Sequence, residues 1–393
     1  MSSSLTTPRP VEPAAGFTAP SLPDLLGQVT DHRARRGRRH RLSTLLAVAL
    51  AAILAGAKSL TSIAEWVNDP VNTSITQLGV NLRKRPSEAT IRRALSHVDA
   101  DLLDRVLGTW MWTRTATINN RRIIAVDGKT VRGARTPSDP DSRAPHLVAA
   151  YDHAGGTVLG QLQIDAKTNE IPALRRLLGQ FDLADCVVTA DALHCQDRTA
   201  EHIIAAGGDY LLTIKGNRPN LLGWAKSKRW KSIRPNTVTE CGHGRRVTRT
   251  TKVLQLADED TNFPHARQLV QVRRTRTVYP AAGSGRTPKK SVEVIYLLCS
   301  LNHVDAPTQA LAGWAQSHWR IENALHWVRD VTFGEDASRV RTGVVPRVMA
   351  TLRSTVISLL RLDGHASIAA ALRFHGRDPG RASLLVRTAH ERL

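Results

Sequence analysis

Apolar residues recur at helical spacing along residues 22–115, as Leu45, Ala49 and Ile53 illustrate. A helix-start signal at residues 86–90 precedes the segment IRRALSHV, and DADLLDRVLGTWMW predicts a further helix. This part of the chain is therefore expected to be a domain of several short helices.

The most apolar stretch is LSTLLAVALAAILAGA at residues 42–57, which follows the basic segment HRARRGRRHR. A membrane anchor with a positive flank is one interpretation. The stretch has 16 residues, whereas a helix needs about 20 to span a bilayer. Ser43 and Thr44 also lie inside it. We favour a buried helix in a folded domain.

The pattern changes after residue 120. RRIIAVDGK, HLVAAYD and TVLGQLQI predict three strands, followed by a helix in NEIPALRRLLGQF, a strand in ADCVVTADAL, a helix in RTAEHIIAAGG and a strand in DYLLTIKGN. This order is that of an RNase H-like sheet, and the helix–strand alternation predicts parallel strands in its second half.

Residues 216–291 interrupt that order. RRVTRTTKVLQL and ARQLVQVRRTRTVY alternate basic or polar with apolar residues, as half-exposed strands do, and the loop AAGSGRTPKK follows. Next come a strand in VEVIYLLCSL, a long helix beginning near residue 307 and an apolar helix in PRVMATLRSTVISLLRL. We expect Trp314, Leu325 and Trp327 of the long helix to face inward.

The predicted fold is α/β, an RNase H-like catalytic core interrupted by a β-rich insertion, with a helical N-terminal domain. The predicted divisions are a disordered tail at 1–21, the helical domain at 22–118, the first part of the core at 119–215, the β-strand insertion at 216–291, the second part of the core at 292–362 and a C-terminal tail at 363–393. The N-terminus lacks the basic start and apolar centre of a secretory signal.

Charge indicates the class of partner. Lys and Arg total 55 against 34 Asp and Glu, giving a formal net charge of +21 and a pI near 10.9. Such a balance favours a polyanion, although ribosomal and membrane-surface proteins share it. Six arginines between residues 33 and 41 would either dock on a duplex or form a solvated loop, and no recognition helix stands out.

The cysteines suggest no metal knuckle. None of the four is close enough to another to form a CxxC pair, so we expect reduced, buried or half-buried thiols in a cytoplasmic protein. The four are Cys186, Cys195, Cys241 and Cys299.

Two carboxylates follow apolar strands. Asp127 and Asp191 are each expected at a strand end, and hence at the rim of one sheet. Paired carboxylates can hold divalent cations for phosphodiester chemistry, but an aspartate at a strand end is also a common turn residue. Glu322 lies on the helix after the insertion, where it could equally form a salt bridge with Arg320 or Arg329. The residues alone leave these alternatives open.

The segments AVDGKTVRGAR, AKTNEIPALRRLL, VTADALHCQ, YLLTIKGN and HWRIENALHWVRDVTFGEDASRVRTG closely resemble the DDE transposases of bacterial insertion sequences, in the branch related to H-repeat-associated proteins. The resemblance extends from about residue 22 to residue 362. It implies an RNase H-like core in which Asp127, Asp191 and Glu322 are the catalytic residues and hold two Mg²⁺ ions, which Mn²⁺ can replace.

The resemblance also implies a function and partners. The enzyme would cleave strands at transposon ends and leave a 3′-OH, which would then attack a phosphodiester of the target DNA and join the strands. Its partners would be double-stranded DNA, as terminal inverted repeats and target, and a second subunit in a homodimer on that DNA. It would lie in the bacterial cytoplasm with the nucleoid, without membrane contact. The rival functions are an inactive or domesticated transposase-derived DNA-binding protein, a stand-alone RNase H-like nuclease and a membrane-anchored basic protein.

Basic residues near these motifs are candidates for DNA contact. They are Lys129, Arg132, His194, Lys215, Arg245, Arg320, His326 and Arg329. His194 could equally be a packed histidine, and His243, Arg245 and Arg246 could belong to a solvated loop. Position 316, often basic in this branch, is Gln316 here.

Overall fold

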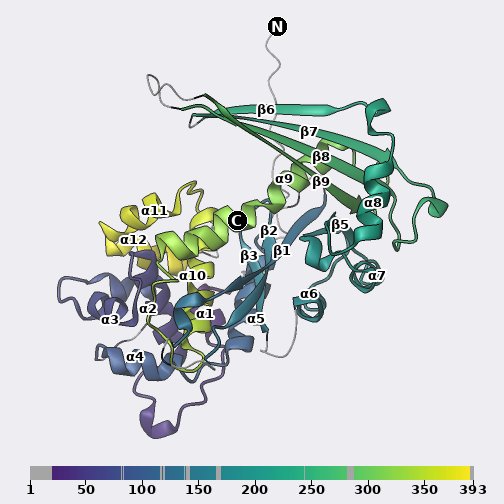
Figure 1. Cartoon of the computed structure of the whole chain (residues 1–393). Coiled ribbons are helices and arrows are strands. Elements are labelled where there is room, and N and C mark those ends of the chain that lie inside the picture. The colour runs from purple at the N-terminus through teal and green to yellow at the C-terminus, as the bar shows by residue number, and fades with distance from the viewer. Residues whose placement is uncertain are drawn as a thin grey trace.

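The computed structural model describes residues 20–80, 82, 84–115, 117, 120–136, 138, 142–164, 170–242, 244–280 and 287–389. Figure 1 shows the arrangement of its helices and strands. The predicted disordered tail at 1–21 lies almost entirely outside these residues, as does His243.

The first part of the described chain is helical. Its α-helices are α1 (Leu22–Leu26), α2 (Leu42–Leu54), α3 (Leu60–Asn68), α4 (Glu88–Leu95) and α5 (Ala100–Trp112). The predicted start of α4 is confirmed, because the Ser87 side chain accepts a hydrogen bond from the Thr90 N–H and caps the helix.

Helix α2 is the centre of this helical group. Every residue of α2 except Ser43 is buried, and α1, α3, α10 (Val345–Leu362) and α12 (Pro379–Thr388) pack around it. A helix that is apolar all round must be enclosed, so the prediction of a buried helix is confirmed. Among the described residues, no helix combines the length and apolarity that crossing a bilayer requires.

Nine strands form one sheet within the described residues, in the order β3-β2-β1-β4-β5-β9-β8-β7-β6. The strands are β1 (Arg122–Thr130), β2 (His146–Asp152), β3 (Val158–Ile164), β4 (Cys186–Ala190), β5 (Asp209–Ile214), β6 (Asn236–Gly242), β7 (Arg245–Gln255), β8 (Gln268–Val278) and β9 (Lys289–Cys299). Helices α6 (Glu170–Leu178) and α7 (Asp197–Ala205) separate β3, β4 and β5, so the predicted element order is confirmed. β1, β4 and β5 are parallel neighbours, also as predicted.

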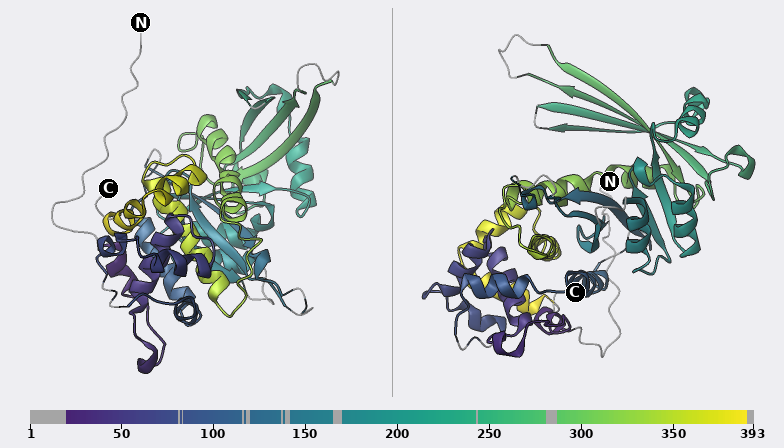
Figure 2. Two further views of the ribbon diagram at one scale, coloured as in Figure 1. Left: turned by 90° about the vertical axis from the view of Figure 1, so that its left-hand side faces the viewer. Right: turned by 60° about the horizontal axis from the view of Figure 1, so that its bottom comes forward.

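Strands β6 to β9 form an arm that projects from the rest of the molecule (Figures 1 and 2). β7, β8 and β9 pair along their full lengths, whereas β9 pairs with β5 only over Tyr296–Cys299. Helix α8 (Pro219–Ser227) precedes the arm. The arm is therefore continuous with the sheet through β9.

The helix after the arm is irregular. Helix α9 (Thr308–His318) is followed by two π-helical turns, η7 (Glu322–His326) and η8 (Val328–Thr332). In these turns the backbone bonds join residues five apart, as from the Phe333 N–H to the Val328 carbonyl. Trp314 and Leu325 are buried as predicted, but Trp327 is 54% exposed. The inward prediction for Trp327 is wrong because wide turns shift the helical phase on which it relied.

Residues beyond 362 are also helical, where the sequence pattern predicted a tail. α11 (Ile368–Gly376) and α12 follow α10, and α12 packs on α2. The buried residues Ala382, Leu385 and Val386 of α12 explain this packing. The two ends of the described chain thus share one helical group (Figure 1).

Candidate functional site

Alternate residues of β1 and β4 face helix α9. Ile123 of β1 and Val187 of β4 belong to the apolar cluster that Leu311 of α9 covers. Side chains two residues apart on a strand share a face, so Asp127 and Asp191 continue this face beyond the apolar cluster. Parallel pairing of Val126 with Ala190 puts the two aspartates on neighbouring strands at the same level.

The position of Asp127 differs from the prediction in one respect. Asp127 lies within β1 and not at its end, because β1 continues to Thr130, which pairs with His146 of β2. Asp191 does follow the last residue of β4, and its carboxylate accepts a hydrogen bond from the Leu193 N–H, 3.0 Å away. Asp127 therefore lies level with the end of β4, while its own strand runs on.

Glu322 belongs to the π-helical turn η7 and lies close to Asp127. The His326 Nδ1 atom lies 3.5 Å from the Asp127 Oδ2 atom and 3.7 Å from the Glu322 Oε2 atom. Ligand atoms of Asp127, Glu322 and His326 all lie within 4.8 Å of one another. Asp191 faces the same space but lies outside that group of atoms. His326 is thus part of a carboxylate cluster, and it is buried.

The charges in this cluster conflict. Burial raises the pKa of Asp127 well above its usual value, and the negative charges of Glu322 and Asp191 raise it further. The His326 ring beside it lowers the pKa of Glu322. Two carboxylates that approach each other in a partly buried space repel. A divalent cation between them would remove this repulsion, so the donor set suits a metal that prefers oxygen ligands.

Two groups at this site were missed by the sequence reasoning. His318, the last residue of α9, contacts the Thr189 hydroxyl at 3.1 Å, on the strand that leads to Asp191. Glu170, the first residue of α6, has its Oε1 atom 2.8 Å from the His146 Nε2 atom and its Oε2 atom 3.6 Å from the His194 Nε2 atom. Glu170 lies in the segment AKTNEIPALRRLL, which predicts a helix and contributes to the family resemblance, so this motif is the signal that could have indicated it.

Glu170 lies directly against the backbone that bears Asp127. A Cβ atom added at Gly128 would come within 2.7 Å of the Glu170 Oε2 atom and 2.6 Å of the His146 Nε2 atom. Only glycine allows this close approach. The neighbouring His146 and His194 rings lower the pKa of Glu170 to about 2.

Four of the eight predicted DNA contacts are buried in this structure, and one of them is His326 of the carboxylate cluster. His194 is 1% exposed and is the packed histidine of the alternative interpretation. Arg329 is fully buried, and its guanidinium donates to the Glu335 carboxylate at 2.7 and 3.0 Å. The Lys129 Nζ atom is buried 2.5 Å from the Asp330 Oδ1 atom. Buried, paired groups are not available to a phosphate.

The remaining candidates lie on the surface. Arg132, Lys215, Arg245 and Arg320 are exposed. Arg245 comes from the arm and Arg320 from the turn after α9, and both line the groove described next. Of the cysteines, Cys186, Cys195 and Cys299 are buried free thiols, whereas Cys241 on β6 is exposed, contrary to expectation.

A groove of about 760 Å³ separates the arm from α9. Its basic lining consists of Arg245, Arg249, Arg274, Arg276 and Arg320. The Arg274 guanidinium lies 5.6 Å from the ring centre of Trp319, and the Gln316 amide donates to Glu240 of β6 at 3.1 Å. Gln316 therefore connects α9 with the arm. The groove opens beside Asn323, the neighbour of Glu322.

Comparisons with known proteins show what the chain is similar to. Residues 118–359 match the family model described as "Transposase DDE domain", and residues 24–111 match the model described as "DDE_Tnp_1-associated". "Putative transposase YncI" of Escherichia coli O157:H7 is 30% identical over 349 residues, 87% of each chain. "H repeat-associated putative transposase YhhI" of Escherichia coli K12 is 27% identical, over 85% of this chain and 89% of its own.

A solved structure of the piggyBac transposase in a synaptic complex with hairpin DNA is also similar. It covers 94% of this chain and 76% of its own, with a TM-score of 0.42 and 9% identity.

Proposed function

Because this chain belongs to the DDE transposase family, we propose that it cleaves DNA strands at transposon ends and transfers them into target DNA. The observation that supports this most directly is the meeting of Asp127, from β1, with Glu322, from η7, beside Asp191. These three residues are separated widely in sequence, and each belongs to a different element.

The first five strands of the sheet are proposed to be an RNase H-like core. The order β3-β2-β1-β4-β5, antiparallel between β3, β2 and β1 and parallel from β1 to β5, supports this. Under this proposal β6 to β9 constitute the insertion, and the helices before β1 form a domain that assists DNA binding.

Asp127, Asp191 and Glu322 would hold two Mg²⁺ ions, or Mn²⁺ in their place. When bound, the ions would activate the attacking hydroxyl and neutralise the charge that develops on the phosphate. The unrelieved repulsion at Asp127 supports a cation at this position. His326 holds Glu322 and Asp127 in place from its buried position between them.

Other residues would orient the carboxylates. Glu170 fixes His194, which lies in the short turn that begins at Asp191. The Lys129–Asp330 pair joins β1 to η8 and so keeps the strand of Asp127 against the helix of Glu322. Both contacts thus involve a residue close in sequence to a proposed ligand, His194 to Asp191 and Lys129 to Asp127.

The DNA partner would be a duplex, bound as terminal inverted repeat and as target. The arginines of the groove can neutralise phosphates along one strand and release the counterions of DNA. Trp319 offers a face on which a base can stack. Since two transposon ends must be paired, a homodimer on DNA is part of the proposal.

The test uses purified protein with a labelled transposon-end duplex, a target duplex and Mg²⁺. Asp127→Asn, Asp191→Asn and Glu322→Gln should each abolish cleavage and joining while the Kd for the end duplex stays unchanged. Glu201→Gln, at an exposed carboxylate on α7, is the matched control and should retain both steps.

Three outcomes would contradict the proposal, each in a different way. Cleavage without joining would make the protein a nuclease, and binding without cleavage would make it an inactive DNA-binding protein. A covalent protein–DNA adduct would exclude direct attack by a hydroxyl. As a further check, a transposon-end duplex with a blocked 3′-end should still permit cleavage but should not be joined to the target.

A further inference from the structure

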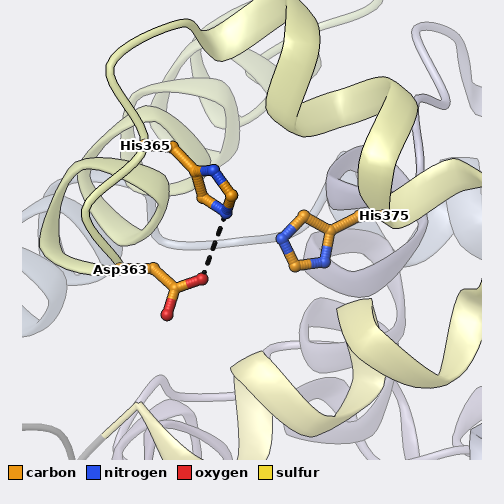
Figure 3. A group of neighbouring side chains, drawn as sticks. All are labelled: Asp363, His365 and His375. Atoms are coloured by element: carbon orange, nitrogen blue, oxygen red, sulfur yellow. Dashed lines mark ion pairs between the residues drawn. The ribbon is translucent and has the colours of Figure 1, made fainter.

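A second group of metal-ligating side chains lies far along the chain from the carboxylate cluster. Asp363 follows the last residue of α10, His365 lies in the next loop and His375 belongs to α11. Their ligand atoms all lie within 4.8 Å of one another. Figure 3 shows the side chains of Asp363 and His365 side by side, with the ring of His375 opposite them.

The buried member of this group has no hydrogen-bond partner. His375 is 2% exposed, and within the described residues neither of its ring nitrogens makes a hydrogen bond. Buried polar atoms are normally satisfied, so an orphaned imidazole requires an explanation. In Figure 3 a ring nitrogen of His375 faces the other two side chains.

We propose that Asp363, His365 and His375 bind one divalent transition metal ion of the zinc class. Two imidazoles and one carboxylate are a common zinc ligand set, which leaves a fourth position for water. Zinc lies about 2.0–2.2 Å from such atoms, which places tetrahedral ligand atoms about 3.3–3.5 Å apart. The His365 Nε2 atom and the Asp363 Oδ2 atom are 3.2 Å apart, so these two are already at nearly the required spacing.

The ligand chemistry separates this site from the carboxylate cluster. Mg²⁺ prefers oxygen ligands and keeps several waters, so two imidazoles bind it poorly. The new site should therefore respond to Zn²⁺ or Co²⁺ and not to Mg²⁺.

The position of the site indicates its effect. A metal here would join the end of α10 to α11, and α11 packs against α2, α12 and η8. η8 also contains Arg329 and Asp330, so the metal would stabilise the helical group that supports the helix of Glu322. The inference does not depend on the proposed function, because it rests on the three side chains alone.

The test uses full-length, tag-free, metal-free protein carrying Asp127→Asn and Glu322→Gln, so that the carboxylate cluster does not compete. Calorimetric titration with Zn²⁺ should give one equivalent, Co²⁺ should produce the strong visible absorption of a tetrahedral site, and Zn²⁺ but not Mg²⁺ should raise Tm. Adding His365→Ala should abolish all three signals, and adding His303→Ala, at an exposed histidine outside the site, should retain them.

His365 is only partly buried, so its replacement should leave the fold intact, which circular dichroism would verify. Asp363→Asn serves as a second variant and should weaken Zn²⁺ binding at least tenfold. Absence of a one-equivalent Zn²⁺ signal in the parent protein, or its persistence in both variants, would overturn the proposal.

Discussion

Replacing Glu335 by Gln tests whether a buried ion network holds the helix of Glu322 in place. The Glu335 carboxylate accepts hydrogen bonds from Arg329 of η8 and from Arg353 of α10, at 2.7 and 3.0 Å. None of the three side chains is more than 1% exposed. Glu335→Gln would leave two buried guanidinium groups without their counter-charge.

The expected loss follows from this burial. Removing one partner of a buried ion pair costs about 3–5 kcal/mol, whereas an exposed pair contributes about 0–1 kcal/mol. Asp258→Asn, which removes the 80% exposed partner of Arg267, is therefore the matched control. We expect Glu335→Gln to lower the free energy of unfolding by about 3–5 kcal/mol at neutral pH, and the control by less than about 1 kcal/mol.

The pH dependence has a definite sign. Arg329 and Arg353 lower the pKa of Glu335 below its usual value, against the effect of burial. Its stabilising charge is therefore fully present above the pKa of the unfolded chain, about 4.3 for Glu, and is lost as pH falls through the lower folded pKa. The difference between wild type and Glu335→Gln should be constant above that pH and shrink below it.

Urea unfolding followed by tryptophan fluorescence, at a series of pH values, measures this difference from the shift in midpoint. A loss no greater than that of Asp258→Asn would refute the reasoning. So would a difference between Glu335→Gln and wild type that grows as the pH is lowered.

Three other changes have expected outcomes. Gly108→Ala on α5 places a Cβ atom 2.2 Å from the Leu159 carbonyl oxygen of β3, so the free energy of unfolding should fall by about 1–3 kcal/mol or more. The control is Gly313→Ala on α9, whose Cβ atom meets no atom within 4 Å and which should not destabilise the protein. Glu170→Gln should slow strand cleavage about 10- to 100-fold with an unchanged Kd for DNA, and an equal loss of DNA binding would contradict an orienting role. Arg245→Ala should reduce the slope of log K against log salt by about 0.9, whereas Arg373→Ala, outside the groove, should leave the slope unchanged in the same titration.

Much of the fold could be predicted because alternation of polar and apolar residues is a local signal. The buried runs of β1, β4 and β5 and the half-exposed alternation of β7 and β8 are each complete within a short segment. Residues 363–393, predicted to be a tail, lack a local helical signal of this kind. α11 and α12 are short helices whose burial depends on α2, more than three hundred residues earlier.

The candidate site was predictable only in part. Asp127 and Asp191 could be located from the ends of buried runs, but pairing with β2 extends β1 beyond Asp127. The burial of Arg329 shows most clearly what local sequence spacing does not predict. A basic residue one or two turns after Glu322 looks exposed on a regular helix, whereas the π-helical turns and the Glu335 carboxylate, six residues after Arg329, bury it. Neither the wider turns nor the return of the following loop onto Arg329 can be inferred from the spacing of a regular helix.

Strand β9 determines how far the chain can be shortened. The predicted insertion ends at residue 291, inside β9, whose last residues pair with β5 on one side and with β8 on the other. Trimming residues 216–291 would remove β8 and leave Ile295 to Cys299 with open backbone groups along one edge. An exposed apolar edge pairs readily with other chains. A minimal catalytic fragment of this protein would therefore need a replacement strand at that edge.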